Sequence, residues 1–199
     1  MNKDFIRNNY LIIRNFISKS TAKEHADEFK KAYHANLLRR DNQVPNSYVS
    51  YQPKLAQILH KEKCNTISDL VGSKLIPTYC FARMYHKGNV LEKHTDRSSC
   101  EVSVTVQLDG DTSWPIWITT PDGKDVSVVL QFGDGMIYLG CIAPHWRTEY
   151  RGKEYTQVFL HYVRSTGLYN KCFFDKERFD QQTHERLKTQ LVKDYRNLL

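Results

Sequence analysis

The chain has 199 residues, of which 29 are Lys or Arg and 22 are Asp or Glu, so its net charge is +7, and 40% of its residues are hydrophobic. A chain of this length can bury one sizeable core, and it contains no apolar run long enough for a signal peptide or a membrane span, so we expect a single soluble, cytoplasmic domain over residues 1–199. The five cysteines form no CxxC pair, which argues against a zinc ribbon and against a secreted disulfide framework.

The positive charge lies at the two ends of the sequence. Residues 1–63 carry six more basic than acidic groups and residues 164–199 carry three more, whereas residues 64–163 carry two more acidic than basic groups. An enzyme that acts on nucleic acid usually has basic surface around the site that grips the phosphates. Because the middle of this chain is slightly acidic, a nucleic-acid partner is disfavoured.

The first third of the chain has a helical pattern. A T-x-x-E capping box at Thr21 is followed by apolar residues at spacings of three and four, which predicts a helix over residues 21–39. Shorter helices are expected over residues 53–61 and 66–71, the second ending before a glycine. Residues 1–76 are therefore predicted to form an N-terminal helical segment.

From Pro77 onward the hydrophobic period changes to two. Valines and Leu108 alternate with polar residues over 102–108, which indicates a half-buried strand. Four further strands are predicted over residues 114–120, 126–131, 136–140 and 155–163, with Pro-Asp-Gly and Gly-Asp-Gly turns between them.

The end of the chain returns to a helical pattern over residues 175–199, with Phe179, Leu187, Leu191 and Tyr195 as its apolar stripe. The order is helices, then seven or eight short strands, then a helix. This order favours a mainly antiparallel β sandwich or barrel with flanking helices over a βαβ fold. We place the β core at residues 77–163 and a C-terminal helical segment at 164–199.

Two HxD triplets occur, and they differ in their predicted backbone. His25-Ala26-Asp27 lies in the first helix, where residues two apart point in nearly opposite directions and cannot bind one ion. His94-Thr95-Asp96 lies in the strand region, where residues two apart face the same side. The second triplet alone is therefore a candidate metal chelate.

A 2-His-1-carboxylate site needs another histidine from a distant strand, and it leaves three coordination positions open. The candidates are His86, His145 and His161. His86 is close to the triplet in sequence and His161 is well inside a predicted strand, whereas His145 directly follows the strand at 136–140. The position of His145 beside Pro144, considered by itself, also agrees with an ordinary histidine in a surface loop.

A set of residues around these histidines resembles the Fe(II)/2-oxoglutarate-dependent dioxygenases. The resemblance is strongest to the small stand-alone members of the prolyl 4-hydroxylase-like group found in bacteria and phages. It covers residues 77–163 in detail and residues 9–30 loosely, and it does not extend beyond Arg164. The matching residues are Ala82 to Gly88, Leu91, His94 to Arg97, Cys100, Glu101, Ser103, Thr105, Gly133, Asp134, His145 and Gly152.

The resemblance implies a double-stranded β-helix, or jelly roll, and an oxygenase that uses Fe(II), 2-oxoglutarate and O2. The metal ligands and catalytic residues would be His94, Asp96 and His145. The reaction would hydroxylate a C–H bond, in a prolyl residue of a peptide or protein or in a free amino acid or other small molecule, and release succinate and CO2. A nucleic-acid-modifying oxygenase and a non-catalytic jelly-roll binding protein are the alternatives.

The resemblance also implies a basic residue that holds the C5 carboxylate of 2-oxoglutarate, on the strand after the distal histidine. Lys153 is the best match, although its distance from His145 is slightly shorter than usual in the family. Arg147 and Arg151 are rivals, and Arg147 is the stronger of these because it lies next to His145. A solvent-exposed loop lysine is the other interpretation of Lys153.

Tyr85 is the second residue expected to contact 2-oxoglutarate. Along residues 79–85 the small apolar side chains alternate with larger ones, so one face suits packing on helices and the other face, with Arg83 and Tyr85, would line the barrel. There a tyrosine hydroxyl can donate to a carboxylate, although a plain core tyrosine fits the pattern too. Arg83 would need an anionic ligand or an acidic neighbour.

Overall fold

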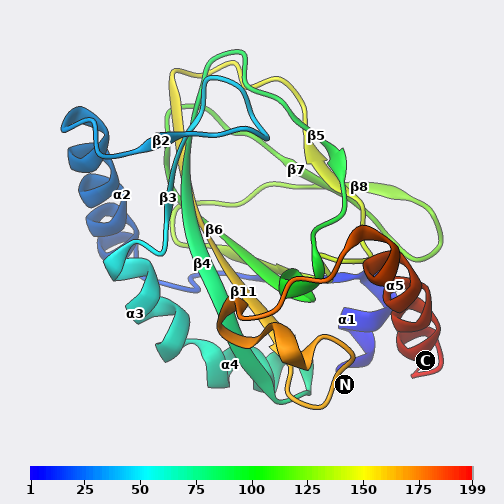
Figure 1. Cartoon of the computed structure of the whole chain (residues 1–199). Coiled ribbons are helices and arrows are strands. Elements are labelled where there is room, and N and C mark those ends of the chain that lie inside the picture. The colour runs from blue at the N-terminus through cyan, green and yellow to red at the C-terminus, as the bar shows by residue number, and fades with distance from the viewer. Residues whose placement is uncertain (199) are drawn as a thin grey trace.

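The computed structural model describes residues 1–198, which form two antiparallel β sheets with helices on the outer face of the larger one (Figure 1). Within these residues no helix combines the length and the apolar character needed to cross a membrane. The helices are α1 (Lys3–Asn8), α2 (Lys19–His34), α3 (Lys54–Glu62), α4 (Cys64–Val71) and α5 (Gln181–Arg196), with 3-10 helices η1 (Ser98–Cys100) and η2 (Asn170–Asp175). The strands are β1 (Tyr10–Ile13), β2 (Arg39–Arg40), β3 (Tyr48–Tyr51), β4 (Leu75–His86), β5 (Leu91–His94), β6 (Val102–Gly110), β7 (Ile116–Thr119), β8 (Asp125–Val128), β9 (Gly135–Tyr138), β10 (His145–Arg147) and β11 (Glu154–Arg164).

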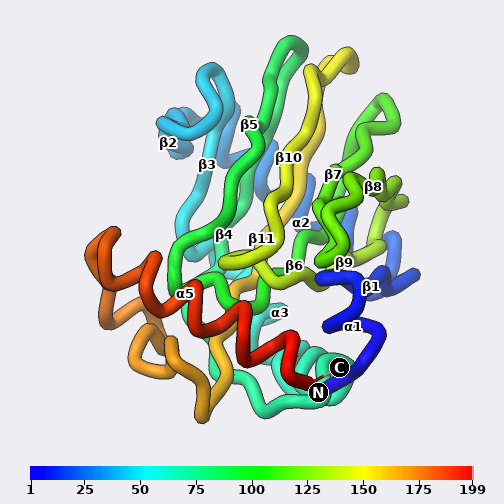
Figure 2. Tube along the Cα trace, turned by 90° about the vertical axis from the view of Figure 1, so that its right-hand side faces the viewer, coloured from blue at the N-terminus to red at the C-terminus, as the bar shows by residue number. Residues whose placement is uncertain are grey.

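The large sheet has the strand order β1-β9-β6-β11-β4-β3-β2, and the small sheet has the order β5-β10-β7-β8. The long strands β4, β6 and β11 form the centre of the large sheet, and their residues are almost all buried. Buried strands of this kind are covered on both faces. Helices cover one face, and the small sheet lies opposite the other (Figures 1 and 2).

The helical cover packs as the sequence predicts. Cys80, Ala82 and Met84 on β4 lie in the same apolar core as Ala26 and Phe29 on α2. The alternate residues of β4 therefore face the space between the sheets, which confirms the predicted orientation of this strand.

The predicted helix boundaries move by a few residues. Helix α2 begins at Lys19, because Ser18 is its N-cap and its hydroxyl accepts a hydrogen bond from the backbone of Thr21 at 3.0 Å. Helix α5 begins at Gln181, because the Asp180 carboxylate accepts from the backbone of Thr183 at 2.9 Å. Caps that satisfy the free N–H groups fix where each helix starts.

Four short strands were not predicted. Strands β1, β2 and β3 lie in the segment expected to be helical, and β10 falls where a loop was expected. Each has two to four residues, too few for a periodic pattern, and each exists because a neighbouring strand offers it backbone hydrogen bonds. Figures 1 and 2 both show α5 passing near α1.

Candidate active site

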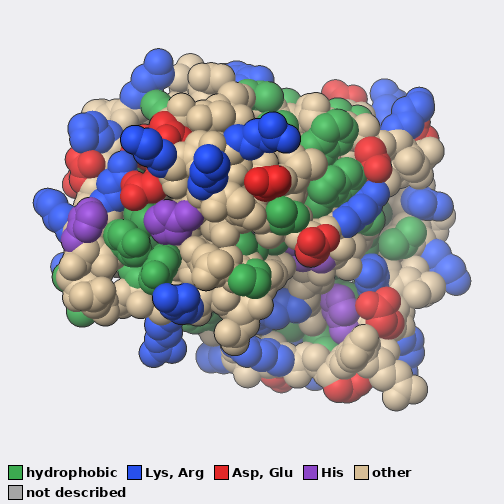
Figure 3. Space-filling view, turned by 90° about the horizontal axis from the view of Figure 1, so that it is seen from above, with side chains coloured by type: hydrophobic (Ala, Val, Ile, Leu, Met, Phe, Trp, Pro, Cys, Tyr) green, Lys and Arg blue, Asp and Glu red, His purple; other side chains and the backbone are tan. Residues whose placement is uncertain are grey.

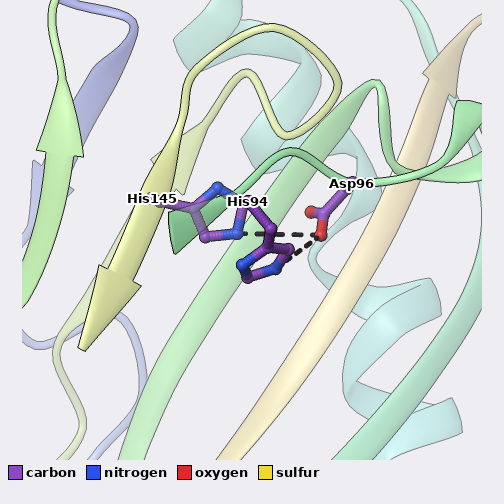
Figure 4. Close-up of side chains that lie close together, drawn as sticks. All are labelled: His94, Asp96 and His145. Atoms are coloured by element: carbon purple, nitrogen blue, oxygen red, sulfur yellow. Dashed lines mark ion pairs between the residues drawn. The ribbon is translucent and has the colours of Figure 1, made fainter. Parts of the chain in front are cut away.

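The two predicted histidine ligands and the carboxylate meet at one point between the sheets (Figure 4). His94 ends β5, Asp96 follows it after one residue, and His145 starts β10, where it pairs directly opposite His94. The Oδ1 atom of Asp96 lies 3.5 Å from Nε2 of His94 and 3.7 Å from Nε2 of His145. The three ligand atoms all lie within 4.8 Å of one another, which suits one shared metal ion.

Backbone carbonyl groups orient both imidazole rings. Nδ1 of His94 lies 2.8 Å from the carbonyl oxygen of Glu92, and Nδ1 of His145 lies 2.9 Å from that of Ala143. A carbonyl oxygen can only accept, so each Nδ1 carries the proton and each Nε2 has its lone pair free. This is the arrangement that metal-binding histidines adopt.

The carboxylate of Asp96 is held by contacts with two neighbouring segments. The backbone N–H of Asp96 donates to the carbonyl oxygen of Gly140 at 2.8 Å, and the Ser103 hydroxyl donates to Oδ2 of Asp96 at 3.2 Å. A Cβ atom at position 140 would lie 2.5 Å from that Oδ2 and 2.5 Å from the carbonyl oxygen of Cys100. A side chain at position 140 would therefore displace the carboxylate.

The electrostatics of Asp96 and His145 favour the forms that bind metal. Burial acts to raise the pKa of Asp96, but the two neighbouring histidines outweigh it and hold this pKa well below its usual range. Burial lowers the pKa of His145, and the Asp96 charge offsets part of this effect. Burial also acts to lower the pKa of His94, but the neighbouring Asp96 carboxylate outweighs burial and raises it, so a metal ion must compete with a proton at this residue. A charged carboxylate beside a neutral His145 is ready to bind a cation.

A cavity of about 780 Å³ opens in front of the three residues. Its inner end is lined by Leu91, Ile116 and Gln157, and one wall is formed by the aromatic side chains of β4 and β11. Its lining also includes the loop between β2 and β3 and one residue of the C-terminal segment, Arg178. A cavity of this size has room for a co-substrate and a second small ligand.

Lys153 does not reach this cavity, so its predicted place on the inner face is wrong. Its side chain is exposed, and its backbone N–H donates to both carboxylate oxygens of Asp111, at 3.0 and 2.8 Å. Residue 153 precedes the first residue of β11, so the alternation of that strand does not control its direction. Arg151 is exposed as well.

Arg147, the rival basic residue, is buried, with only 1% of its surface exposed. Its Nη2 donates to the amide oxygen of Gln157 at 2.9 Å and to the Tyr155 hydroxyl at 3.4 Å, and its Nη1 donates to the carbonyl oxygen of Trp114. Among residues 1–198 no carboxylate pairs with it. A buried cation with neutral partners is costly unless an anion binds beside it.

Tyr85 connects this arginine to a second one. Its hydroxyl accepts from Nη1 of Arg83 at 3.0 Å and from the amide nitrogen of Gln157 at 3.2 Å. Arg83 is also buried, but the carboxylate of Asp41 lies 2.5 Å from its Nη2. The acidic neighbour expected for Arg83 is therefore present. Gln157, to which the sequence pattern gives no role, forms hydrogen bonds with both Arg147 and Tyr85.

The other two candidate histidines have different surroundings. His86 packs against Tyr33 and Tyr48, away from the metal ligands. His161 lines the cavity, its Nδ1 lies 2.9 Å from the Ser103 hydroxyl, and burial lowers its pKa to about 3. Since Ser103 has acceptors at Asp96 and at the carbonyl of Cys100, it donates to one of them and accepts from His161.

Comparison with protein-family models and with curated proteins finds no match. Comparison with solved structures finds a prolyl-4-hydroxylase of Pseudomonas putida, with a TM-score of 0.68, 15% identity, and coverage of 81% of this chain and 95% of that one. The 2-oxoglutarate-dependent epimerase SnoN from nogalamycin biosynthesis gives a TM-score of 0.70, 12% identity, and coverage of 81% and 80%. HygX of Streptomyces hygroscopicus, with nickel and 2-oxoglutarate bound, gives a TM-score of 0.67 and 12% identity, with coverage of 82% of this chain and 86% of that one. The chain therefore has the fold of the 2-oxoglutarate- and iron-dependent oxygenases, the jelly roll with flanking helices that its sequence predicts.

Proposed function

We propose that the chain is an Fe(II)- and 2-oxoglutarate-dependent oxygenase that hydroxylates a C–H bond of a substrate bound in the cavity. The convergence of His94, Asp96 and His145 next to a cavity of about 780 Å³ carries this proposal. When bound, iron supplies the oxidising chemistry, in which 2-oxoglutarate and O2 are converted to succinate and CO2 as the substrate is hydroxylated.

The protein would hold the metal from one side. The three side chains occupy three positions and leave the others open toward the cavity. Carbonyl groups fix both imidazoles, and the Ser103 hydroxyl and the backbone around Gly140 fix the carboxylate. Rigid support of this kind keeps a metal ligand set in place while the open positions exchange their occupants.

We assign the C5 carboxylate of 2-oxoglutarate to Arg147, with Tyr85 nearby. Two buried guanidinium groups contact the residues around the cavity: Arg83 lines it and already has Asp41 as its counter-ion, whereas Arg147 lies next to it and donates to Gln157, which lines it. Arg147 has no such partner within residues 1–198, so a carboxylate bound there would compensate its charge with charge-assisted hydrogen bonds. Gln157 and Tyr85 would orient the same group.

The substrate would be a prolyl residue of a peptide or protein, or a free amino acid or other small molecule. The fold is similar both to a prolyl-4-hydroxylase and to SnoN and HygX, so the likeness supports each class. A nucleic-acid substrate is disfavoured, because residues 64–163 carry more acidic than basic groups and, on the face that Figure 3 shows, Lys and Arg side chains are spread with Asp and Glu among them. A non-catalytic binding protein would not need all three metal ligands.

The metal site is tested by anaerobic titration with Fe(II). We expect about one ion per chain, and strongly reduced binding for His94→Ala, Asp96→Ala and His145→Ala, because each variant loses one of three ligands. His25→Ala is the control, since its HxD triplet lies on helix α2. Unchanged binding in Asp96→Ala would exclude this ligand set.

Activity is tested by succinate release in the presence of pools of peptides, free amino acids and oligonucleotides. We expect turnover with peptides or small molecules and a weak dependence on salt. Binding to the phosphate backbone of a nucleic acid loses affinity steeply as the salt concentration rises. Turnover of an oligonucleotide with at least a tenfold loss of kcat/KM between low and physiological salt would instead support the nucleic-acid alternative.

The assignment of Arg147 is tested by 2-oxoglutarate binding to the metal-loaded protein. Arg147→Met should raise the Kd at least about tenfold, or ~1.4 kcal/mol, because it removes the uncompensated cation. Arg147→Lys should restore part of the affinity, and Tyr85→Phe should have a smaller effect than Arg147→Met, since it removes one neutral donor.

Lys153→Ala is the matched control for this measurement, because its side chain is exposed outside the cavity. We expect its 2-oxoglutarate affinity to equal that of the wild type. Reduced affinity in Lys153→Ala together with normal affinity in Arg147→Met would reverse the assignment.

A further inference from the structure

Arginines from separate parts of the sequence meet around the cavity. Arg39 comes from β2, Arg97 follows the metal-binding triplet, and Arg178 comes from the segment that precedes α5. All three line the same cavity, together with the buried Arg83. Such a set makes the cavity electropositive unless carboxylates of the protein neutralise it.

The carboxylates beside these arginines neutralise two of them. Asp41 pairs with Arg83 at 2.5 Å. Asp175 forms two hydrogen bonds with Arg97, at 2.5 and 3.1 Å, and it also lies 2.9 Å from Arg178. One carboxylate cannot neutralise two guanidinium groups, so Arg178 retains charge.

Arg39 has no acidic partner within residues 1–198, and its side chain is exposed. Asp96 also lines the cavity, but its carboxylate faces the two histidines at the metal site. The cavity therefore has two guanidinium groups in excess, Arg39 and Arg178, and neither takes part in the metal or 2-oxoglutarate site proposed above.

One wall of the same cavity is aromatic. Phe81 and Phe159 stack with ring centroids 4.7 Å apart, and Tyr51 stacks on Tyr79 with centroids 5.1 Å apart. All four rings line the cavity, and both Phe81 and Tyr51 are partly exposed. Aromatic surfaces of this kind favour planar or apolar groups.

We propose that the substrate is a small organic anion. Its carboxylate or phosphate group would bind Arg39 and Arg178, and its planar or apolar body would lie on the Phe81–Phe159 wall, toward the metal ligands. A guanidinium group offers paired N–H donors that match both kinds of anion. The identification of this ligand as the substrate rests on the proposed function, whereas the anion site depends on the cavity alone.

This proposal gives a role to the segment after Arg164, to which the family resemblance does not extend. Asp175 fixes the segment beside the cavity, because its carboxylate also accepts from Ser99 at 2.8 Å and from the Tyr51 hydroxyl at 2.5 Å. In Figure 1 the segment (orange) crosses the lower part of β4 and β11 before it enters α5. The contact holds Arg178, three residues further on, at the cavity.

The test is calorimetry on protein loaded with Ni(II) and N-oxalylglycine, so that the metal and 2-oxoglutarate sites are filled. The ligands are phenylacetate, phenyl phosphate and the neutral phenylacetamide. We expect at least one of the two anions to bind tenfold or more tightly than the amide, and the stronger of them identifies the anionic group. In Arg39→Gln/Arg178→Gln this preference should disappear, while binding of the amide stays the same.

Arg40→Gln is the matched control, because Arg40 adjoins Arg39 but lies over the Tyr48 ring, 5.8 Å from its centroid, and does not line the cavity. It should retain the full preference for anions. An amide that binds as well as both anions, absence of binding by all three, or a preference that survives in the double variant would overturn the proposal. Tighter binding of an oligonucleotide that depends on the same two arginines would also overturn it, in favour of nucleic acid.

Failure of Ni(II) or N-oxalylglycine to bind would count against the proposed function and not against the anion site. The same three ligands are then compared on the metal-free protein. Loss of the preference for anions in the double variant, with retention in Arg40→Gln, would still support the site. Both arginine side chains are exposed, so the variants are expected to fold.

Discussion

Gly140 determines where the carboxylate of Asp96 can lie. A Cβ atom there would come within 2.5 Å of Asp96 Oδ2 and within 2.7 Å of the Ser103 hydroxyl, and neither atom can move without losing its hydrogen bond. We expect Gly140→Ala to weaken Fe(II) binding at least about tenfold, or ~1.4 kcal/mol, because the carboxylate must turn away from the two histidines. Anaerobic Fe(II) titration measures the effect.

The control for this prediction is Gly123→Ala. Gly123 has a φ of +83° in the turn between β7 and β8, where a Cβ atom would meet nothing within 4 Å. Its substitution should lower the free energy of unfolding through backbone strain, and it should leave Fe(II) affinity unchanged. If both variants lost Fe(II) affinity equally, general destabilisation and not the position of Asp96 would be responsible.

At the scale of elements, Glu101 joins the end of β11 to the C-terminal helix. It is fully buried, its Oε1 lies 2.6 Å from Nε of Arg164 and 3.1 Å from the Tyr195 hydroxyl, and its Oε2 accepts from the Arg164 backbone at 3.0 Å. Each of these groups donates to the same carboxylate, so its loss leaves them all unpaired. Glu101 thus holds α5 against the large sheet.

We predict that Glu101→Ala lowers the free energy of unfolding by roughly 3 kcal/mol, the usual effect of removing one partner of a buried ion pair. Urea unfolding measures this change, and amide hydrogen exchange should become faster in α5 before it does so in β11. Asp125→Asn is the control, because its ion pair with Lys93 is exposed and should contribute little. Equal exchange rates in α5 of the variant and the wild type would show that other contacts hold this helix.

At the scale of the whole molecule, buried histidines couple stability to pH. Burial lowers the pKa of His60 to about 4, and its Nε2 lies 2.8 Å from the carbonyl oxygen of His161. Burial also lowers the pKa of His25 and His184, more mildly. Between pH 6.5 and 4 the unfolded chain therefore binds a proton at His60 that the folded chain does not bind.

The free energy of unfolding should consequently fall as the pH falls from about 6.5 toward 4, and His60 alone contributes at most about 1.4 kcal/mol per pH unit. His60→Gln keeps an N–H donor for the His161 carbonyl but cannot be protonated in this range. Urea unfolding at pH 7, 6 and 5 should thus give a smaller slope for the variant. An identical slope would show that His60 does not contribute.

The spacing of hydrophobic residues predicted the helices and strands that are long enough to repeat it several times. The alternation over residues 102–108 marks β6, and the apolar spacing after Thr21 marks α2. It also distinguished the two HxD triplets, because a helix separates His25 from Asp27 whereas extended backbone brings His94 and Asp96 to one side. Both outcomes depend on the backbone geometry of a few neighbouring residues, and the local hydrophobic spacing indicates that geometry.

Contacts between distant segments determined the rest. The pairing of β5 with β10 sets His145 opposite His94, and three residues give no periodic signal for such a strand. Burial of Arg147 follows from the pairing of β10 with β5 and β7, and exposure of Lys153 follows from where β11 begins, which depends on its pairing with β4 and β6. Local sequence thus predicted the type of each long element and the placement of His94 and Asp96 on one side of the chain, because neighbouring residues fix both. Contacts between distant segments decided that Arg147 is buried while Lys153 is exposed, and which arginines line the cavity, because these features depend on residues far apart in the chain.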